Sequence, residues 1–369
     1  MIMDIAGEYM ARCLKLAAHG RGNVSPNPMV GAVIVCDGRI IGEGYHRCFG
    51  EAHAEVNAIS SVKDESLLRQ STLYVNLEPC SHYGKTPPCA ELIIRKGIPR
   101  VVIACMDPYH EVAGRGIRMM REAGVEVVVG VLENEAAGLN RFFMTAHKKC
   151  RPYIILKCAQ SKDGFIDHVR NDMSEKPAIL STTITRMMVH KLRSEVQAIM
   201  VGTNTAILDN PSLTVRHWRG KSPVRVLVDR SLRVPVEHKL FDGTQHTFVF
   251  TEQIHGDITI ELSDKVNIEY LESDSFIHFL INITKSLFDK NIHSLLVEGG
   301  SQLHQSFIRE GLWDEIIVET SPVNLTNGVK SAVFQDIGDM HLIEKCIIPK
   351  YVSGVEKPSV IERYINRVV

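Results

Sequence analysis

One histidine and two cysteines in the first quarter of the chain have the residue types and the order of a metal site. His53 is followed by Cys80 and then by Cys89. Two thiolates and one imidazole form a ligand set that suits Zn²⁺. Three protein ligands leave the fourth position of a tetrahedral zinc open to water, which is typical of a catalytic site rather than a structural one. The pattern therefore predicts one catalytic zinc ion per chain.

Glu55 is the candidate proton carrier beside this metal. It lies two positions after the histidine, and a carboxylate there can move protons between zinc-activated water and a leaving group. His-x-Glu followed by Pro-Cys, here Pro79-Cys80, is the arrangement of zinc-dependent base deaminases. Most free cysteines are small buried residues, but the joint order favours zinc. Residues 81–88 separate the cysteines where the general signature has only two residues.

The neighbouring segments would bring these ligands together. Residues 71–77 are predicted to form a strand, so Cys80 would lie just past its carboxyl end, where ligands gather in open α/β sheets. Predicted helices begin at His53 and, after Pro87-Pro88, at Cys89. Both ligands would then lie in a first helical turn, where aligned amide dipoles favour a thiolate.

Composition limits the class of protein. The chain has 369 residues, 44% hydrophobic and 23% charged, with a net charge of −1, which suits a globular protein of two domains. The balanced charge indicates neither a nucleic-acid nor a membrane partner. Asp4 and Glu8 occupy the region where a signal peptide is basic. Nine irregularly spaced cysteines are typical of reduced thiols, so we expect a cytoplasmic enzyme.

The first domain is expected to cover residues 1–148. A helix over 4–18 precedes two strands, 30–36 and 39–45, whose connection Asp37-Gly38 is a strong hairpin signal. Strands then alternate with helices, which predicts a three-layer α/β/α sandwich with a mixed sheet. The remaining expected elements are a helix from 53, a strand at 71–77, a helix from 89, a strand at 100–105, a helix at 116–123 and a strand at 125–130.

A second α/β domain is expected over residues 152–369, after the junction Arg151-Pro152. Its sheet is expected to be about as large as the first, and the tail after about 331 to form closing strands and loops. The expected strands are 153–159, 196–201, 224–229, 247–251, 293–298 and 315–320, and the expected helices are 182–193, 276–288 and 301–310.

Three short segments follow strands of this second domain as turns: 161–164, 202–205 and 299–301. Glycine between a strand and a helix lets the backbone approach a phosphate closely. Each turn alone is more often a plain loop, but three at strand carboxyl ends favour a nucleotide or phosphosugar cleft. The G-x-G-x-x-G fingerprint is absent, so the sequence does not predict a conventional Rossmann site.

Longer motifs resemble one known family, the bifunctional riboflavin-biosynthesis deaminase/reductases, and the wide Cys80–Cys89 spacing is typical of it. The resemblance covers nearly the whole chain and implies a cytidine-deaminase-like domain followed by a dihydrofolate-reductase-like domain that uses NADPH. The motifs that carry it are SPNPMVGAVIV at 25–35, HAE at 53–55, LEPCSHYGKTPPC at 77–89, DP at 107–108 and VAGRG at 112–116.

The resemblance also implies two activities. The first is hydrolytic deamination of 2,5-diamino-6-(5-phosphoribosylamino)pyrimidin-4(3H)-one, and the second is NADPH-dependent reduction of its ribosyl side chain to ribityl. The small-molecule substrate would be a phosphoribosyl pyrimidine. In the deaminase, His53, Cys80 and Cys89 would bind zinc and Glu55 would shuttle protons. The deaminase substrate pocket would contain Asn27, His46, His82 and Lys85.

Residue assignments in the reductase half follow from the same resemblance. Where the family often has a tryptophan beside the cofactor, residues 175–180 read EKPAIL, so no cofactor contact is assigned there. Arginine suits phosphate, which makes Arg193 and Arg216 candidate phosphate clamps. The implied NADP contacts are Ala159, Thr205, Asp209, Gly300, Ser301, Gln302, Leu303, His304, Gln305 and Ser306. The implied substrate contacts are Arg193, Leu213, Arg216 and Glu298.

Two other classes of function fit the sequence less well. A nucleic-acid or nucleoside zinc deaminase with an appended domain would need a basic face with stacking aromatics, whereas aromatic residues make up 6% of the chain and its charge is balanced. A scaffold protein with structural zinc would normally supply a fourth ligand and would not need Glu55. The sequence leaves open the oligomeric state, including a homo-oligomer, and the stereochemistry of hydride transfer.

Overall fold

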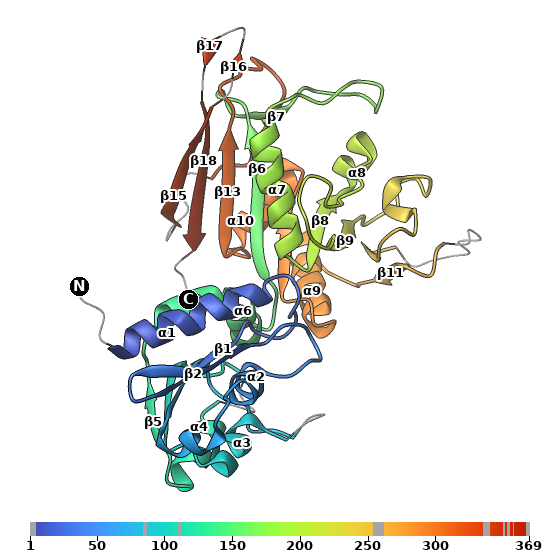
Figure 1. Cartoon of the computed structure of the whole chain (residues 1–369). Coiled ribbons are helices and arrows are strands. Elements are labelled where there is room, and N and C mark those ends of the chain that lie inside the picture. The colour runs from blue at the N-terminus through green and yellow to red at the C-terminus, as the bar shows by residue number, and fades with distance from the viewer. Residues whose placement is uncertain are drawn as a thin grey trace. The chain divides into compact units, whose positions relative to one another are not determined.

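The structure is a computed structural model that describes residues 5–83, 87–109, 113–253, 262–334, 340–349, 351–352, 355–356 and 358–366. The chain divides into two compact units, Met1–Cys150 and Arg151–Val369, each with its own sheet (Figure 1). Among the described residues, no helix is both long and apolar enough to cross a membrane.

The first unit is built on a five-stranded mixed sheet in the order β2-β1-β3-β4-β5. β1 is antiparallel to β2 and β3, whereas β3, β4 and β5 are parallel. Asp37 and Gly38 have φ values of 48° and 72°, as a tight hairpin turn between β1 and β2 requires. The strands are β1 Gly31–Cys36, β2 Arg39–Tyr45, β3 Thr72–Leu77, β4 Arg100–Cys105 and β5 Glu126–Val129.

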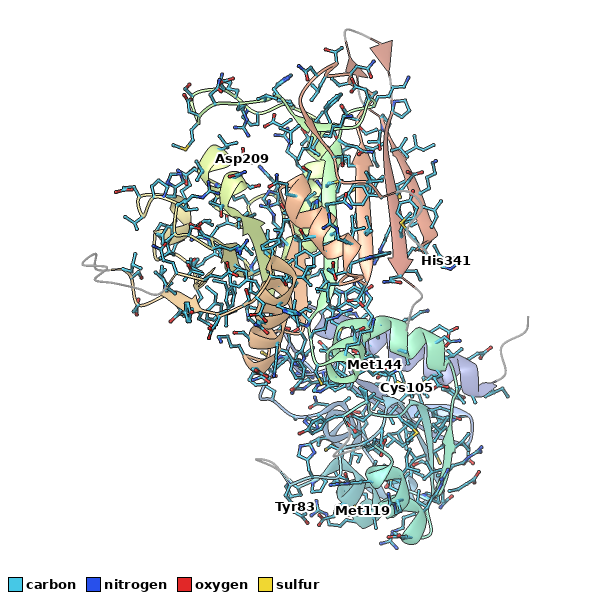
Figure 2. All side chains as sticks on the ribbon, turned by 180° about the vertical axis from the view of Figure 1, so that it is seen from behind. Tyr83, Cys105, Met119, Met144, Asp209 and His341 are labelled. Carbon is cyan, nitrogen blue, oxygen red and sulfur yellow. The ribbon has the colours of Figure 1, made fainter. Side chains whose placement is uncertain are left out.

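Helices cover both faces of this sheet, because alternate strand residues point to opposite sides. Cys105 belongs to the apolar cluster beneath α1 and α5, and Met119 of α4 packs against the cluster beneath α2, α3 and α4 (Figure 2). The predicted three-layer α/β/α sandwich is therefore confirmed. The helices are α1 Ile5–Ala17, α2 Ala54–Ser60, α3 Cys89–Lys96, α4 Arg115–Glu122, α5 Glu133–Leu139 and α6 Arg141–Lys149, with 3₁₀ turns at Ala18–Gly20 and Glu65–Gln70.

The second unit has a nine-stranded sheet in the order β11-β10-β9-β8-β12-β6-β13-β18-β15. The strands from β11 to β13 in this order are all parallel. β18 is antiparallel to β13, and β15 is antiparallel to β18. The strands are β6 Tyr153–Gln160, β8 Ala198–Gly202, β9 Val224–Val228, β10 Thr247–Thr251, β11 Val266–Tyr270, β12 Ser294–Val297, β13 Glu315–Thr320, β15 Met340–Ile348 and β18 Ser359–Asn366, with β7 Phe165–Asp167 paired to β14 Val329–Lys330 and β16 Tyr351–Val352 paired to β17 Val355–Glu356.

The expectation that the two sheets are about equal in size is wrong, since the second has nine strands and the first has five. The additional strands lie at the edges of the sheet. β15, for example, is mostly exposed, so it lacks the apolar alternation by which a half-buried strand is found in a sequence.

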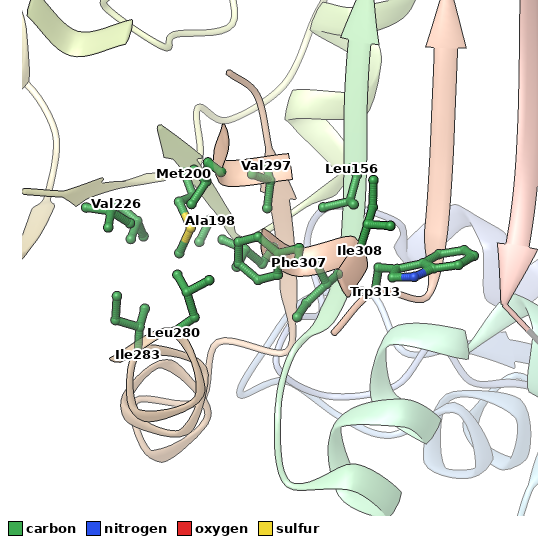
Figure 3. Packing of buried hydrophobic residues seen from close by; sticks show 14 of the residues in the cluster. Leu156, Ala198, Met200, Val226, Leu280, Ile283, Val297, Phe307, Ile308 and Trp313 are labelled. Atoms are coloured by element: carbon green, nitrogen blue, oxygen red, sulfur yellow. The ribbon is translucent and has the colours of Figure 1, made fainter. Parts of the chain in front are cut away.

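Helices α9 and α10 bury the core of the second unit against its central strands. Phe307 of α10 and Leu280 of α9 face Met200 and Val297 of the sheet, with Trp313 at one end of the cluster (Figure 3). The predicted turn over 202–205 is wrong beyond Gly202, because a helix begins at Thr203. The helices are α7 Thr183–Glu195, α8 Thr203–Asp209, α9 Phe276–Asp289 and α10 Ser301–Arg309, with a 3₁₀ turn at Lys239–Phe241.

Candidate metal centre and cofactor cleft

The three predicted zinc ligands lie together at the carboxyl end of β3. His53 is the N-cap of α2, Cys89 is the first residue of α3, and Cys80 follows β3. His53 Nδ1 is 3.5 Å from Cys80 Sγ and 3.4 Å from Cys89 Sγ, and all three atoms lie within 4.8 Å of one another. Zinc bonds of about 2.1 Å to nitrogen and about 2.3 Å to sulfur in a tetrahedron imply ligand separations of about 3.6 Å. The donor set therefore fits zinc.

Cys80 is already poised as a thiolate in this cluster. A hydrogen bond from the Cys89 thiol, together with His53 and the backbone N–H of Cys89, lowers the pKa of Cys80 to about 4. The hydrogen bond to Cys80 raises the pKa of His53 to about 9, and the pKa of Cys89 is raised because its thiol donates to Cys80. A bound metal has to displace the protons held by Cys89 and His53, so zinc binding is expected to strengthen as the pH rises.

Glu55 lies in the first turn of α2 and is 3% exposed. Burial, with a smaller contribution from the nearby Cys80, raises the pKa of Glu55 to about 7. A carboxyl group with a pKa near neutrality can accept a proton and donate it again at the same pH. This is the property that a proton shuttle needs, and the geometry places it beside the metal ligands without making it one.

Glu78 fixes the segment that precedes α4. In the sequence it is visible only as one residue of the motif at 77–89. Its buried carboxylate accepts backbone N–H groups from Asp107 at 3.3 Å, Gly114 at 3.0 Å, Gly116 at 3.0 Å and Ile117 at 3.3 Å. These hydrogen bonds attach the segment before α4 to the residue two positions before Cys80. Glu78 is therefore a positioning residue for that ligand.

A methyl group at Gly116 should disturb the centre. An added Cβ would lie 2.2 Å from the Pro79 carbonyl oxygen, so Pro79 and the adjacent Cys80 must move. Because displacing a reacting group by about 1 Å can cost about 10²-fold in rate, we expect Gly116→Ala to lose deaminase activity on that scale and to bind zinc more weakly. Ammonia release and zinc content measure both effects.

Gly138→Ala is the matched control for Gly116→Ala. Gly138 lies in α5, and an added Cβ meets nothing within 4 Å. Normal ammonia release by Gly116→Ala, or equal losses in the two variants, would show that the approach to Pro79 does not control the centre.

Two of the predicted substrate-pocket residues adjoin the zinc ligands. The rings of His46 and His53 are 5.6 Å apart, and Asn27 Nδ2 lies 3.4 Å from His46 Nε2. Burial lowers the pKa of His46 and so favours its neutral form. In that form Nδ1–H donates to Ala52 O at 3.1 Å, and Nε2 is the acceptor. His82 is exposed on the inter-cysteine loop, and Lys85 lies outside the described residues.

Two asparagines that the sequence did not single out hold the segment of Asn27. Asn76 accepts the N–H of Gly31 at 2.7 Å and donates to Met29 O at 3.0 Å. Asn140 accepts the N–H of Met29 at 2.8 Å and donates to the same carbonyl at 2.9 Å. They come from β3 and from the end of α5, so no local motif links them to this segment.

The second unit contains a cleft of about 1080 Å³ at the carboxyl ends of its parallel strands, where open α/β sheets bind ligands. Gln305 and Ser306 are the predicted cofactor residues that do not line it; Gln305 instead accepts the N–H of Val333 at 3.0 Å, and Ser306 donates to Gln302 O at 2.9 Å. The predicted residues that line the cleft are Ala159, Thr205, Asp209, Glu298, Gly300, Ser301, Gln302, Leu303 and His304.

The turn between β12 and α10 approaches α8 closely. Gly299 and Gly300 have φ values of 134° and 68°, and a Cβ on Gly299 would lie 2.9 Å from Thr205 Cγ2. Residue 299 therefore has to be glycine. The turn lies at the start of α10, and the N-terminus of a helix is where backbone amide groups can bind a phosphate.

Arg193 and Arg216 occupy different environments. The Arg193 guanidinium donates to both carboxylate oxygens of Glu298, at 2.9 and 2.6 Å, and to Thr214 O at 3.1 Å. Arg216 is exposed, donates to Ser212 Oγ at 2.6 Å and contacts no carboxylate among the residues that the structure describes. Neither predicted clamp is among the residues that line the cleft. Arg216 is the one of the two whose charge is available to an anion.

The loop of Arg216 is fixed by two buried side chains. His190 Nδ1 accepts the N–H of Arg216 at 3.0 Å; burial, with nearby arginines, lowers the pKa of His190 to about 4, so this nitrogen remains an acceptor at neutral pH. Arg225 donates from Nε to Ser212 O at 3.0 Å. Leu213, which follows Ser212, is buried and has a φ of 52°. It is not among the residues that line the cleft.

Asp209 ends α8, as Figure 2 shows, and forms an ion pair with Arg170, which sequence reasoning missed. Arg170 also donates to Asp167 at 2.6 Å and to Leu208 O at 3.1 Å, so it ties its loop to α8. Residues 177–181 line the cleft as well, although no cofactor contact was assigned to residues 175–180. Lys157 also lines the cleft, and its Nζ lies 3.8 Å from Glu319 Oε2.

Comparisons with known proteins match both units. A family model described as "Cytidine and deoxycytidylate deaminase zinc-binding region" matches residues 3–105, and the model "RibD C-terminal domain" matches residues 152–346. The riboflavin biosynthesis protein RibD of Aquifex aeolicus (strain VF5) is 39% identical over 341 residues, covering 92% of each chain. That of Bacillus amyloliquefaciens is 41% identical over 322 residues, covering 85% of this chain and 84% of its own.

A solved structure agrees with these relatives. The diaminohydroxyphosphoribosylaminopyrimidine deaminase/5-amino-6-(5-phosphoribosylamino)uracil reductase of Thermotoga maritima superposes with a TM-score of 0.82 at 34% identity, covering 98% of this chain and 99% of that one. Its likeness extends over both units and therefore over the metal centre and the cleft.

Proposed function

This chain belongs to the family of bifunctional riboflavin-biosynthesis deaminase/reductases, and from that premise we propose which residues carry its two reactions. It is an enzyme with a zinc-dependent deaminase half and an NADPH-dependent reductase half. The observation that carries the assignment is the cluster of His53, Cys80 and Cys89 beside the buried Glu55, inside the matched zinc-binding region. The cytoplasmic location expected from the sequence stays a prediction.

In the deaminase half, the substrate is the diaminopyrimidine phosphoriboside that the name of the Thermotoga relative specifies. Zinc, when bound, supplies activation of water at neutral pH. Glu55 accepts a proton as water adds to the amino-bearing ring carbon and returns it to the departing nitrogen, so that ammonia leaves and a carbonyl remains. Asn27 and His46 offer hydrogen-bonding groups to the ring beside the ligands.

In the reductase half, the protein orients a phosphorylated sugar against the cofactor. NADPH, when bound, supplies the hydride that converts the ribosyl carbon to the open ribityl chain. Arg216 is proposed to hold the substrate phosphate, and Glu298, kept in place by Arg193, lies at the cleft wall where the sugar would react. The turn at Gly299-Gly300 is proposed to hold the cofactor diphosphate.

The comparisons support this assignment over a nucleic-acid deaminase with an appended domain, because the reductase family model matches residues 152–346. The direct test is to incubate the purified protein with the diaminopyrimidine phosphoriboside. Ammonia should be released without NADPH, and NADPH oxidation should follow once the deaminated product is present. Failure to release ammonia from a zinc-loaded protein would contradict the deaminase assignment.

Asp209→Asn tests the cofactor side of the cleft. The change preserves shape but removes the charge that pairs with Arg170, and Asp209 lines the cleft. We expect reductase turnover to fall at least tenfold, about 1.4 kcal/mol of transition-state stabilisation, while ammonia release is unchanged. NADPH oxidation with pre-deaminated substrate gives the measurement.

Asp289→Asn is the control for Asp209→Asn, since Asp289 is an exposed aspartate at the end of α9 outside the cleft. A normal turnover in Asp209→Asn would leave Asp209 as a helix-terminal residue without a role in reduction. If the melting temperature of Asp209→Asn falls together with its turnover, Asp209 has a structural role instead.

A further inference from the structure

A buried carboxylate lies behind the wall of the cleft in the second unit. Glu319, near the end of β13, is 1% exposed and is not among the residues that line the cleft. Ser181, which does line it, donates its hydroxyl to Glu319 Oε2 at 2.6 Å. Glu319 Oε1 has no hydrogen-bond partner within the described part of the chain. Burying a carboxylate with so few partners costs free energy, so stability alone does not account for this residue.

The cation that faces Glu319 is Lys157 of β6. Leu156 belongs to the apolar cluster under α9 and α10 (Figure 3), so Lys157 points to the opposite face of the sheet. Ile317 of β13 lies opposite Lys157, and Glu319, two positions further, shares that face. Lys157 lines the cleft, and its Nζ lies 3.8 Å from Glu319 Oε2. Glu319 therefore reaches the cleft through the residues in front of it.

Lys157 also lies near a second carboxylate, that of Glu298. β6 lies between β12 and β13, and Glu298 follows β12. Burial raises the pKa of Glu298, but the charges around it, Arg193 first and then Lys157, lower it overall, so the charge of Lys157 reaches Glu298. Among the described residues, however, Lys157 forms its ion pair with Glu319 and not with Glu298.

The direction in which Lys157 is drawn decides what it can do, because its ammonium group is a point charge on a flexible stem. If it paired with Glu298, the two groups would satisfy each other, and neither would be available to the phosphoribosyl pyrimidine of the proposed function, on which this inference rests. Held toward Glu319, Lys157 keeps its ammonium at the cleft wall, and Glu298 keeps Arg193 as its partner.

We propose that Glu319 is a positioning residue of the reductase, which holds Lys157 apart from Glu298 so that the ammonium group faces an oxygen of the bound substrate. Ser181 fixes the carboxylate in the orientation that this requires. The role depends on the negative charge of Glu319 more than on its shape, because Lys157 is attracted across 3.8 Å without a hydrogen bond.

Two substitutions of Glu319 separate charge from shape. Glu319→Gln keeps the shape and an acceptor for Ser181 but removes the charge, whereas Glu319→Asp keeps the charge on a side chain that is one methylene shorter. With pre-deaminated substrate, kcat/KM for NADPH oxidation should fall at least about tenfold in Glu319→Gln, since misplacing a group at the reacting centre is costly, and should fall less in Glu319→Asp. A purely structural role would reverse this order, because a neutral amide is buried at a smaller cost than a carboxylate.

A double-mutant cycle shows whether Glu319 acts through Lys157. Lys157→Met removes the ammonium group and keeps most of the length of the side chain. The readout is the Kd of the pre-deaminated substrate, titrated with NADP⁺ in place of NADPH so that no turnover occurs. Glu319→Gln should raise this Kd at least about fivefold in the otherwise unmodified protein, as expected when a charge-assisted contact is lost, and less than about twofold in the Lys157→Met protein.

Glu269→Gln is the matched control. It removes the carboxylate from another lysine pair of the same unit, in which Lys290 Nζ lies 3.0 Å from Glu269 Oε2, outside the cleft, and it should leave kcat/KM and Kd unchanged. The melting temperature and ammonia release establish that each variant is folded.

Two outcomes would overturn the role of Glu319. One is a higher kcat/KM in Glu319→Gln than in Glu319→Asp, and the other is an equal effect of Glu319→Gln on Kd with and without the Lys157 ammonium group. If the unmodified protein does not oxidise NADPH with pre-deaminated substrate, the proposed reductase itself is contradicted, and the role of Glu319 with it.

Discussion

Glu55→Gln is expected to retain zinc and to release ammonia about 10²–10⁴-fold more slowly, the usual scale for loss of general acid–base catalysis. The amide has the shape of the carboxyl group but cannot carry a proton. Burial already disfavours the charged form of Glu55, so a neutral amide should cost the fold little. Metal content and ammonia release from the same sample separate the role of ligand from that of proton carrier.

Glu51→Gln is the control for this change. Glu51 is an exposed glutamate two positions before His53, and its substitution should leave both readings unchanged. The assignment of Glu55 fails if the variant loses its zinc, which would make the carboxylate a ligand or a structural support. It also fails if ammonia release stays near the original rate.

The metal centre could be predicted from the sequence because its chemistry is concentrated in short segments. His53 and Glu55 share one helix start, and Cys80 and Cys89 flank one loop. Residue type alone restricts the ligand to a few metals. The three-layer sandwich could be predicted for a similar reason, since the alternation of short strands and helices is a local property of the chain.

The positioning residues could not be found this way. Asn140 contacts Met29 across 111 positions, and Arg193 contacts Glu298 across 105. Nothing in the local pattern distinguishes a buried asparagine or a paired arginine from a surface one. Arg193 shows the consequence: its residue type suits a phosphate, but the fold supplies Glu298 as its partner.

The glycines of the second domain predicted the positions of its turns only in part. The pair Gly299-Gly300 marked a turn after a strand, which is correct, but the reason for Gly299 is the nearby side chain of Thr205. At Gly202 the same reasoning predicted a turn that continues to residue 205, whereas α8 begins at Thr203. A glycine in a sequence indicates conformational freedom, and only the packing shows which neighbour requires it.

Cys80→Ser should abolish zinc binding and deamination while leaving reduction intact. A serine hydroxyl is not ionised at neutral pH and is a poor match for zinc in a thiolate site, so we expect no bound zinc and no measurable ammonia release. The reductase unit buries its own apolar cluster, which includes Phe250, Phe279 and Trp313, separate from those of the first unit. NADPH oxidation with pre-deaminated substrate should therefore continue at the original rate.

Cys48→Ser is the control for Cys80→Ser, because Cys48 is a free, partly exposed cysteine of the same unit outside the ligand cluster. Equal loss of deamination and reduction in a folded Cys80→Ser protein would mean that the two reactions depend on one composite site. The apolar clusters that each unit has of its own argue against that outcome. Retained reduction with lost zinc would show that each unit performs its reaction with its own residues.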